Sequence, residues 1–149
     1  VYSPSRKASM LQRLNKVGDA WQLEAADSTP WQTPEKWTAG QALLLGVDAE
    51  PLAAWSAAAC IGIEFPAFND GRGLSLAVLL RTRIGFQGDL RATGNIHEDV
   101  LHYMIRCGFT SFDLPPERDA QTALASLRPY SAFYQGSASA PEPAFPPAD

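Results

Sequence analysis

A repeated junction between a helix and a strand most strongly constrains the fold of this chain. The sequence RIGF at 83–86 recurs as RCGF at 106–109, 23 residues further on. Each copy follows an apolar segment of helical length and precedes a short strand-like run, and its glycine suits the left-handed residue that ends a helix. This spacing accommodates one helix plus one strand. The repeat therefore predicts an α/β fold with a mostly parallel sheet built from successive strand–helix units.

Apolar patterning extends this alternation along the chain. The residues between 58 and 65 are apolar at nearly every position, which predicts an interior strand near the centre of the sheet. Asn95 is expected to cap the following helix, with Glu98 as its reciprocal partner. About five strands are too few for an eight-stranded barrel, so an open sheet is preferred over a partial barrel. The expected strands are 20–25, 42–47, 58–65, 89–92 and 110–114, and the expected helices are 50–57, 74–84, 95–107 and 117–127.

The two ends of the chain differ in composition from this central part. Residues 1–19 are polar and basic, which predicts a loose N-terminal arm. Residues 136–149 are rich in Ser, Ala and Pro, which predicts a disordered tail. A single α/β domain is expected between them, over residues 20–135.

Charge and residue types exclude several classes of protein. The net charge of −4 and the isoelectric point near 5.1 argue against a nucleic-acid partner. No apolar run reaches the ~20 residues that a membrane helix needs. Cys60 and Cys107 form no metal-binding pattern, and His97 and His102 are poorly spaced for a shared metal. No cofactor motif is visible, and we expect a cytoplasmic protein without a metal or cofactor.

The loop after the apolar strand is the first candidate site. Two glycines flank Arg72 directly before a helix, where backbone amides and a guanidinium can hold an anion. Asp70 is expected to cap the helix or to orient an arginine, and Ser75 lies within reach of a ligand in the first turn. The alternative is a glycine turn with an Asp–Arg surface pair. The candidate anion-binding residues of this loop are Asp70, Gly71, Arg72, Gly73 and Ser75.

The next strand adds a second arginine to this candidate site. Arg91 lies between apolar neighbours, so it needs either an anion or an ion pair with Asp70 or Glu64. Asn95 follows at the end of the same strand. Glu64 is either a carboxylate satisfied at the end of the sheet or a general acid or base. We expect Arg72 and Arg91 to face a shared cavity, while Arg81 lies on a solvated helix face.

The sequence FPAFNDGRGLSLA at 65–77 resembles a bacterial family of unknown function whose members carry an FPxFxDGRGYSxARLLR segment. The likeness continues through GFQGDLRATG at 85–94 and RCGF at 106–109, and it covers Leu43 to Gln135. The family is described as probable oxidoreductases of sulfite reduction, because its members accompany the enzymes of sulfate assimilation. The chain departs from the family pattern at Leu74, Val78, Asn95 and Val100.

This resemblance implies an accessory protein of assimilatory sulfite reduction. Such a protein would bind a small oxyanion or dock with the sulfite reductase or another enzyme of sulfate assimilation. The alternative is an enzyme that acts on a small oxyanion or a phosphorylated metabolite. Arg81 and Asp99 match the family pattern, and together with Glu64 they are the expected supporting residues.

Overall fold

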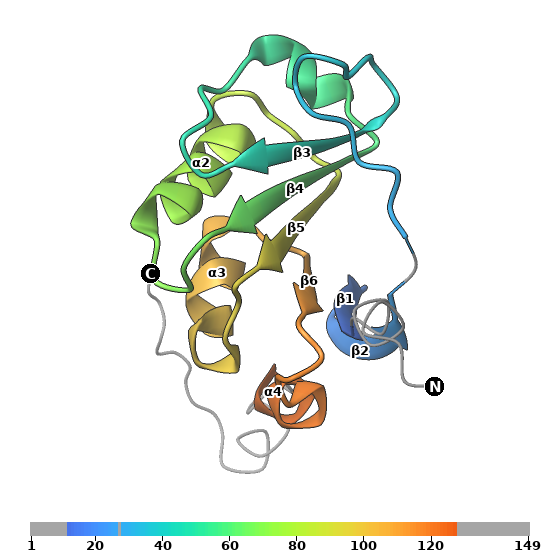
Figure 1. Ribbon diagram of the computed structural model, residues 1–149, viewed down its shortest axis with the longest axis vertical. Helices are drawn as coiled ribbons and strands as arrows, with labels where there is room; N and C mark the ends of the chain where they lie inside the picture. The colour runs from blue at the N-terminus through green and yellow to red at the C-terminus, as the bar shows by residue number, and fades with distance from the viewer. Residues whose placement is uncertain (1–11, 27, 128–149) are drawn as a thin grey trace, which may run out of the picture.

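The computed structural model describes residues 12–26 and 28–127, which form one open α/β sheet with helices (Figure 1). The strand order is β2-β1-β6-β5-β4-β3. Neighbours from β3 to β6 are parallel, and β1 is antiparallel to both β2 and β6. The elements are β1 (Gln12–Val17), β2 (Ala20–Ala25), β3 (Ala42–Gly46), η1 (Ala53–Ala57), β4 (Cys60–Phe65), α2 (Gly71–Thr82), β5 (Asp89–Gly94), η2 (Glu98–Val100), α3 (Leu101–Cys107), β6 (Ser111–Leu114) and α4 (Ala120–Leu127).

The open, mostly parallel sheet confirms the fold predicted from the repeated junction. Both repeated glycines have a positive φ, 77° at Gly85 and 117° at Gly108. The strand over 20–25 has the predicted bounds, and β4 is an interior strand. It lies second from the β3 edge rather than near the centre, because the N-terminal hairpin extends the sheet on the far side of β6.

Several predicted boundaries were wrong. Residues 12–17, expected within a loose arm, form β1 and pair with both β2 and β6. A short 3₁₀ turn replaces the helix predicted over 50–57, and α2 begins at Gly71, three residues earlier than predicted. Asn95 caps no helix, since His97 precedes η2 and Val100 precedes α3. The rest of the predicted arm and the predicted tail lie outside the described residues.

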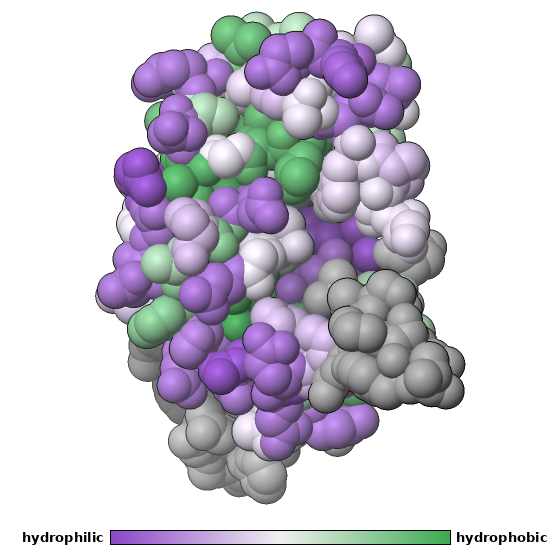
Figure 2. All heavy atoms as spheres, viewed as in Figure 1, coloured by the Kyte–Doolittle hydropathy of each residue, from purple (hydrophilic) through white to green (hydrophobic). Residues whose placement is uncertain are grey.

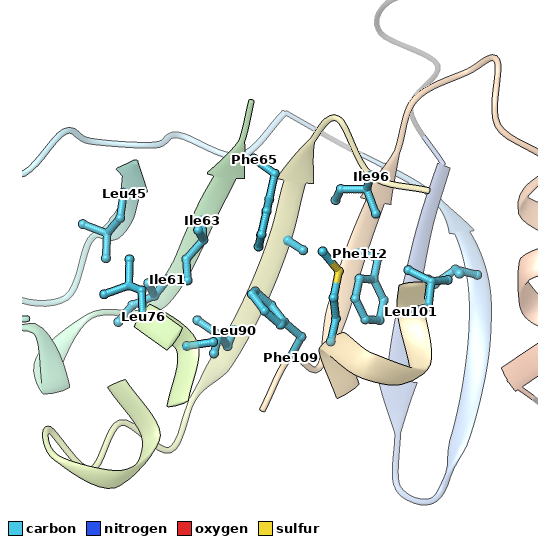
Figure 3. Close-up of a cluster of buried hydrophobic side chains, with 14 of the residues drawn as sticks. Leu45, Ile61, Ile63, Phe65, Leu76, Leu90, Ile96, Leu101, Phe109 and Phe112 are labelled. Carbon is cyan, nitrogen blue, oxygen red and sulfur yellow. The ribbon is translucent and has the colours of Figure 1, made fainter. Parts of the chain in front are cut away.

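The hydrophobic core lies between the sheet and α2, α3 and α4 (Figure 3). Alternate strand residues such as Ile61, Ile63 and Phe65 point to this face, as the two-residue period of a strand requires. Phe109 lies near Phe65 and Phe112, with ring centroids 5.9 and 6.2 Å apart. The side chains shown in Figure 3 come from both strands and helices, so one contiguous core joins these elements.

The opposite face of the sheet carries no helix among the described residues. The start of the connection from β2 to β3 crosses it instead, and Gln32 then pairs with Leu43 at the β3 edge (Figure 1). Trp31 lies directly over Gly62, where a Cβ atom would come within 2.6 Å of the indole ring. Glycine at this position therefore makes room for the tryptophan, and the polar strand residues on this face are partly covered.

Candidate functional site

Two open hollows lie beyond the carboxyl ends of β3 and β4, where parallel sheets commonly bind ligands. Their volumes are about 520 and 440 Å³. Arg72 lines both hollows, as do Val47 and Asp48. The first continues along the start of α2, and the second reaches the end of β4. The remaining lining residues are Ala49, Glu50, Pro51, Gly71, Ser75, Leu76 and Leu79 in the first, and Gly46, Glu64, Phe65 and Pro66 in the second.

Asp70 organises the start of α2 and holds the arginine of the loop. One carboxylate oxygen accepts hydrogen bonds from the backbone N–H and the Nε of Arg72, both at 3.0 Å. The other accepts from Arg72 Nη2 at 2.7 Å. These hydrogen bonds lower the pKa of Asp70 and, with the carboxylate charge, raise the pKa of Arg72. Both predicted roles of Asp70, helix cap and orienting partner, are present in one residue.

The charges around Arg72 disfavour a free oxyanion in these hollows. Arg72 is already paired with Asp70, and its side chain remains 61% exposed. The lining includes the carboxylates of Asp48, Glu50 and Glu64, all exposed, with Arg72 as the one basic side chain among the described lining residues. A small anion would therefore meet more carboxylates than cations along this lining.

The second glycine of the loop has a packing role. A Cβ atom on Gly73 would lie 2.3 Å from Cε2 of Phe65, so only a glycine lets α2 approach β4 this closely. A Cβ atom on Gly71 would meet nothing within 4 Å. The contact between α2 and β4 therefore explains the glycine at position 73, without a ligand.

Arg91 does not join Arg72. Its side chain lies on the helix-free face, and its partners differ from both predicted carboxylates. Nη2 donates to Asp89 at 2.6 Å, and Nε donates to Ser111 Oγ at 2.9 Å. The guanidinium also lies 5.8 Å from the Trp31 ring centroid. The shared cavity expected for Arg72 and Arg91 is therefore absent from the described structure.

The other predicted residues occupy separate positions. Ser75 and Glu64 line the hollows beside Arg72, one in each. Asn95 is exposed after β5, and its backbone N–H donates to Phe65 O at 2.8 Å. Asp99 is exposed in η2. The structure thus brings Arg72, Ser75 and Glu64 to one edge.

Arg81 lies at the opposite end of the sheet and binds backbone carbonyls. Nε and Nη2 donate to Gly108 O at 3.0 and 2.8 Å. Nη1 donates to Phe86 O at 2.9 Å and to Gly88 O at 2.8 Å. The predicted solvated face was wrong for this residue, because its guanidinium joins the end of α2 to the start of β5 and the end of α3.

The two cysteines lie in separate environments, and burial disfavours the thiolate form of each. Burial raises the pKa of Cys60 to about 12, and the nearby Asp89 carboxylate opposes the thiolate further. Burial also raises the pKa of Cys107, at the end of α3. Because the thiolate is the reactive form, neither group is primed for thiol chemistry. Within residues 12–26 and 28–127, no group of three or more His, Cys, Asp or Glu side chains could hold a metal ion.

Sequence reasoning missed residues at the carboxyl edge and on the helix-free face of the sheet. Asp48 lies two residues after the end of β3, and its place after an apolar strand was a usable signal for the carboxyl edge. Arg13 was assigned to the loose arm, yet it is buried in β1 and pairs with Asp113 at 2.7 Å. Asp89 lies two residues before Arg91, so the period of the strand already put both on one face.

These features define a small α/β domain with two open hollows at the carboxyl ends of its parallel strands. The chain belongs to the family described as "Bacterial protein of unknown function (DUF934)", whose match spans residues 44–145. This confirms the bacterial family of unknown function expected from the DGRG loop. No curated protein and no solved structure matches the chain. No helix in the described part of the chain has the length and apolar character to cross a membrane.

Proposed function

We propose that this protein is an accessory component of assimilatory sulfite reduction that docks with the sulfite reductase. The observation that carries the proposal is the position of the DGRG loop, the segment that resembles the sulfite-reduction family. This loop places Arg72 at the edge of two open hollows, with most of its side chain exposed. An exposed arginine beside a partly apolar hollow is a common anchor in protein interfaces.

Docking accounts for this edge better than binding of a free oxyanion. The hollows are wide and solvent-exposed, whereas small-molecule sites enclose most of their ligand. Leu76, Leu79 and Pro51 supply apolar lining, and the carboxylates around Arg72 repel small anions. A partner surface can offer both charges and apolar side chains at the same time. A docked partner could therefore contact both the apolar and the charged residues that line the hollows.

An accessory role also agrees with the chemistry of the thiols. The raised pKa values of Cys60 and Cys107 leave no ready thiolate for electron or group transfer through these residues. The proposal assigns the redox chemistry to the reductase and the binding to this chain. The proposal also implies a cytoplasmic location, which the cysteine usage predicts.

Copurification with the sulfite reductase at physiological salt tests the proposal. The wild-type chain should retain the reductase, and Arg72→Ala should weaken that binding about tenfold or more. Arg83→Ala is the matched control, because Arg83 is also exposed but lies at the far end of α2. Absence of binding by the wild type would overturn the proposal. Turnover of a small oxyanion or phosphorylated metabolite by the isolated chain would instead favour the alternative enzyme.

A further inference from the structure

Two buried arginines converge on a single oxygen atom on the helix-free face. Arg13 is in β1 and Arg91 is in β5, so they lie on either side of β6. Arg13 is 6% exposed and Arg91 is 9% exposed. Arg91 Nη1 donates to Thr29 Oγ1 at 3.1 Å, and Arg13 Nη2 donates to the same oxygen at 3.4 Å. One neutral hydroxyl thus accepts from two cations.

Each arginine also donates hydrogen bonds to an aspartate carboxylate. Asp113 accepts from Arg13 Nε at 2.7 Å and from Nη2 at 3.3 Å. Asp89 accepts from Arg91 Nη2 at 2.6 Å. The position occupied by Thr29 Oγ1 is therefore reached by Nη atoms of both arginines, while each arginine keeps its own counter-charge.

This position suits an anionic oxygen better than a hydroxyl. An anionic oxygen adds charge attraction to both guanidinium groups, which a neutral hydroxyl cannot supply, and arginine is the usual residue for such recognition. The hydroxyl belongs to a segment without regular structure, where Ser28 and Pro30 are exposed and Thr29 is half-buried. Figure 2 shows hydrophilic side chains in a recess beside the strands, and the exposure of Ser28 and Pro30 keeps this segment at the surface.

We propose that Arg13 and Arg91 form a binding position for a small oxyanion, which Thr29 fills when no anion is bound. The ligand class is a sulfate-, sulfite- or phosphate-like anion, because each supplies an oxygen able to accept from both guanidinium groups. One anion oxygen would take the place of Thr29 Oγ1, and the segment around Thr29 would move aside. This site lies on the opposite face of the sheet from α2, and it does not depend on the docking proposed above.

Two substitutions of Thr29 separate a binding position from a structural contact. Thr29→Gly removes the hydroxyl and vacates the position, whereas Thr29→Val fills it with a methyl group that accepts no hydrogen bond. Calorimetric titration with sulfate, sulfite and phosphate, each in turn, measures binding to both variants and to the wild type. Potassium chloride at matched ionic strength controls for general screening. Ser28→Gly controls for added backbone freedom in the same segment.

Thr29→Gly should bind at least one of the three anions about tenfold more tightly than the wild type, since the competing hydroxyl is gone. Thr29→Val and Ser28→Gly should show no gain. The same anion should raise the thermal unfolding midpoint of Thr29→Gly alone, as expected for a ligand of the folded state. Equal responses of Thr29→Gly and Thr29→Val would overturn the proposal, as would no binding by Thr29→Gly.

Two double variants test whether the tighter anion binding of Thr29→Gly depends on the buried arginines. Thr29→Gly with Arg91→Lys keeps the charge but loses the planar fork, and it should lose the tighter binding. Thr29→Gly with Arg72→Ala should keep it. Loss of binding in the Arg72 double variant would place the anion at the DGRG loop and overturn the proposal. Binding to the reductase is measured separately, so failure of either proposal leaves the other intact.

Discussion

The carboxyl edge and the helix-free face of the sheet each hold an arginine–aspartate pair of the same length, in different environments. Arg72 Nη2 lies 2.7 Å from Asp70, and Arg13 Nε lies 2.7 Å from Asp113. The Arg72 side chain is 61% exposed, whereas the side chains of the second pair are 8% and 5% exposed. The distance between two charges therefore says little about their role. Burial decides whether a pair is available to a partner or fixed within the fold.

The physical reason is the balance between solvation and attraction. Water solvates both partners of an exposed pair, so separating them changes stability little. A buried pair loses that solvation on folding, and removal of one partner leaves the other charge uncompensated. The Arg72 pair can thus exchange partners during docking. The Arg13 pair joins β1 to β6 at register positions that face one another.

Removal of the buried carboxylate should have the largest effect on stability. Asp113→Ala leaves Arg13 without this counter-charge and should lower the free energy of unfolding by about 3 kcal/mol. Asp113→Asn, which keeps the size and a hydrogen-bond acceptor, should cost less. Urea denaturation measures both. A loss below about 1 kcal/mol for Asp113→Ala would mean that the buried pair contributes no more to stability than an exposed pair does.

A larger side chain at Gly73 of the DGRG loop should have the next largest effect on the free energy of unfolding. Gly73→Ala forces a methyl group against Phe65 and should cost about 1–3 kcal/mol. Gly71→Ala is its control, since the added atom meets nothing within 4 Å and should leave stability nearly unchanged. Thermal or chemical unfolding compares the two. Equal costs would show that the packing against Phe65 does not explain the second glycine.

Acid should selectively weaken the pair formed by Arg91 and Asp89. Burial alone would raise the pKa of Asp89, but hydrogen bonds from Thr110 and Ser111 and the attraction of Arg91 outweigh it, and the net pKa is lowered. A lowered folded-state pKa stabilises the protein above the unfolded-state value of about 3.9. That stabilisation is lost as the pH falls through the lower folded-state value.

Denaturation at a series of pH values measures this effect against Asp89→Asn. The stability difference between the wild type and Asp89→Asn should shrink as the pH is lowered from about 6 to about 2. A difference that stays constant over this range would show that the Asp89 charge does not contribute to stability.

Truncation at the exposed pair should have the smallest effect on folding. Arg72→Ala should leave the thermal unfolding midpoint nearly unchanged, because the Arg72 side chain is 61% exposed and Asp70 keeps its hydrogen bond from the backbone N–H of residue 72. The same variant should still weaken retention of the reductase. A marked fall in the midpoint would mean that Arg72 is a structural residue, and its effect on docking would then need a different explanation.

The sequence contained enough information for the parallel part of the sheet. Glycines after helices and apolar runs of strand length identify β4, β5 and β6 because those signals are local. Asp70 was also recognisable as a helix cap from its position before Gly71. These features depend on neighbouring residues, so they survive without knowledge of the tertiary contacts.

The parts that failed depend on distant contacts. The β1 sequence QRLNKV is mostly polar, and its burial arises from β6, a hundred residues away in the pair Arg13–Asp113. Arg91 stood out as a charge in an apolar strand, but its partner was misassigned. The partner Asp89 lies on the same strand face, and the pairing also depends on Ser111 and Thr110 of a later segment.

The antiparallel contact between β1 and β6 has a consequence for the order in which this protein is made. On a ribosome, β1 and β2 emerge early and can pair with each other, but the second edge of β1 must wait until residues 111–114 have been synthesised. Closing so long a loop late in synthesis is slow relative to local pairing. The first-made hairpin therefore joins the sheet last. Its unpaired edge is then the part of the nascent chain most exposed to non-native partners.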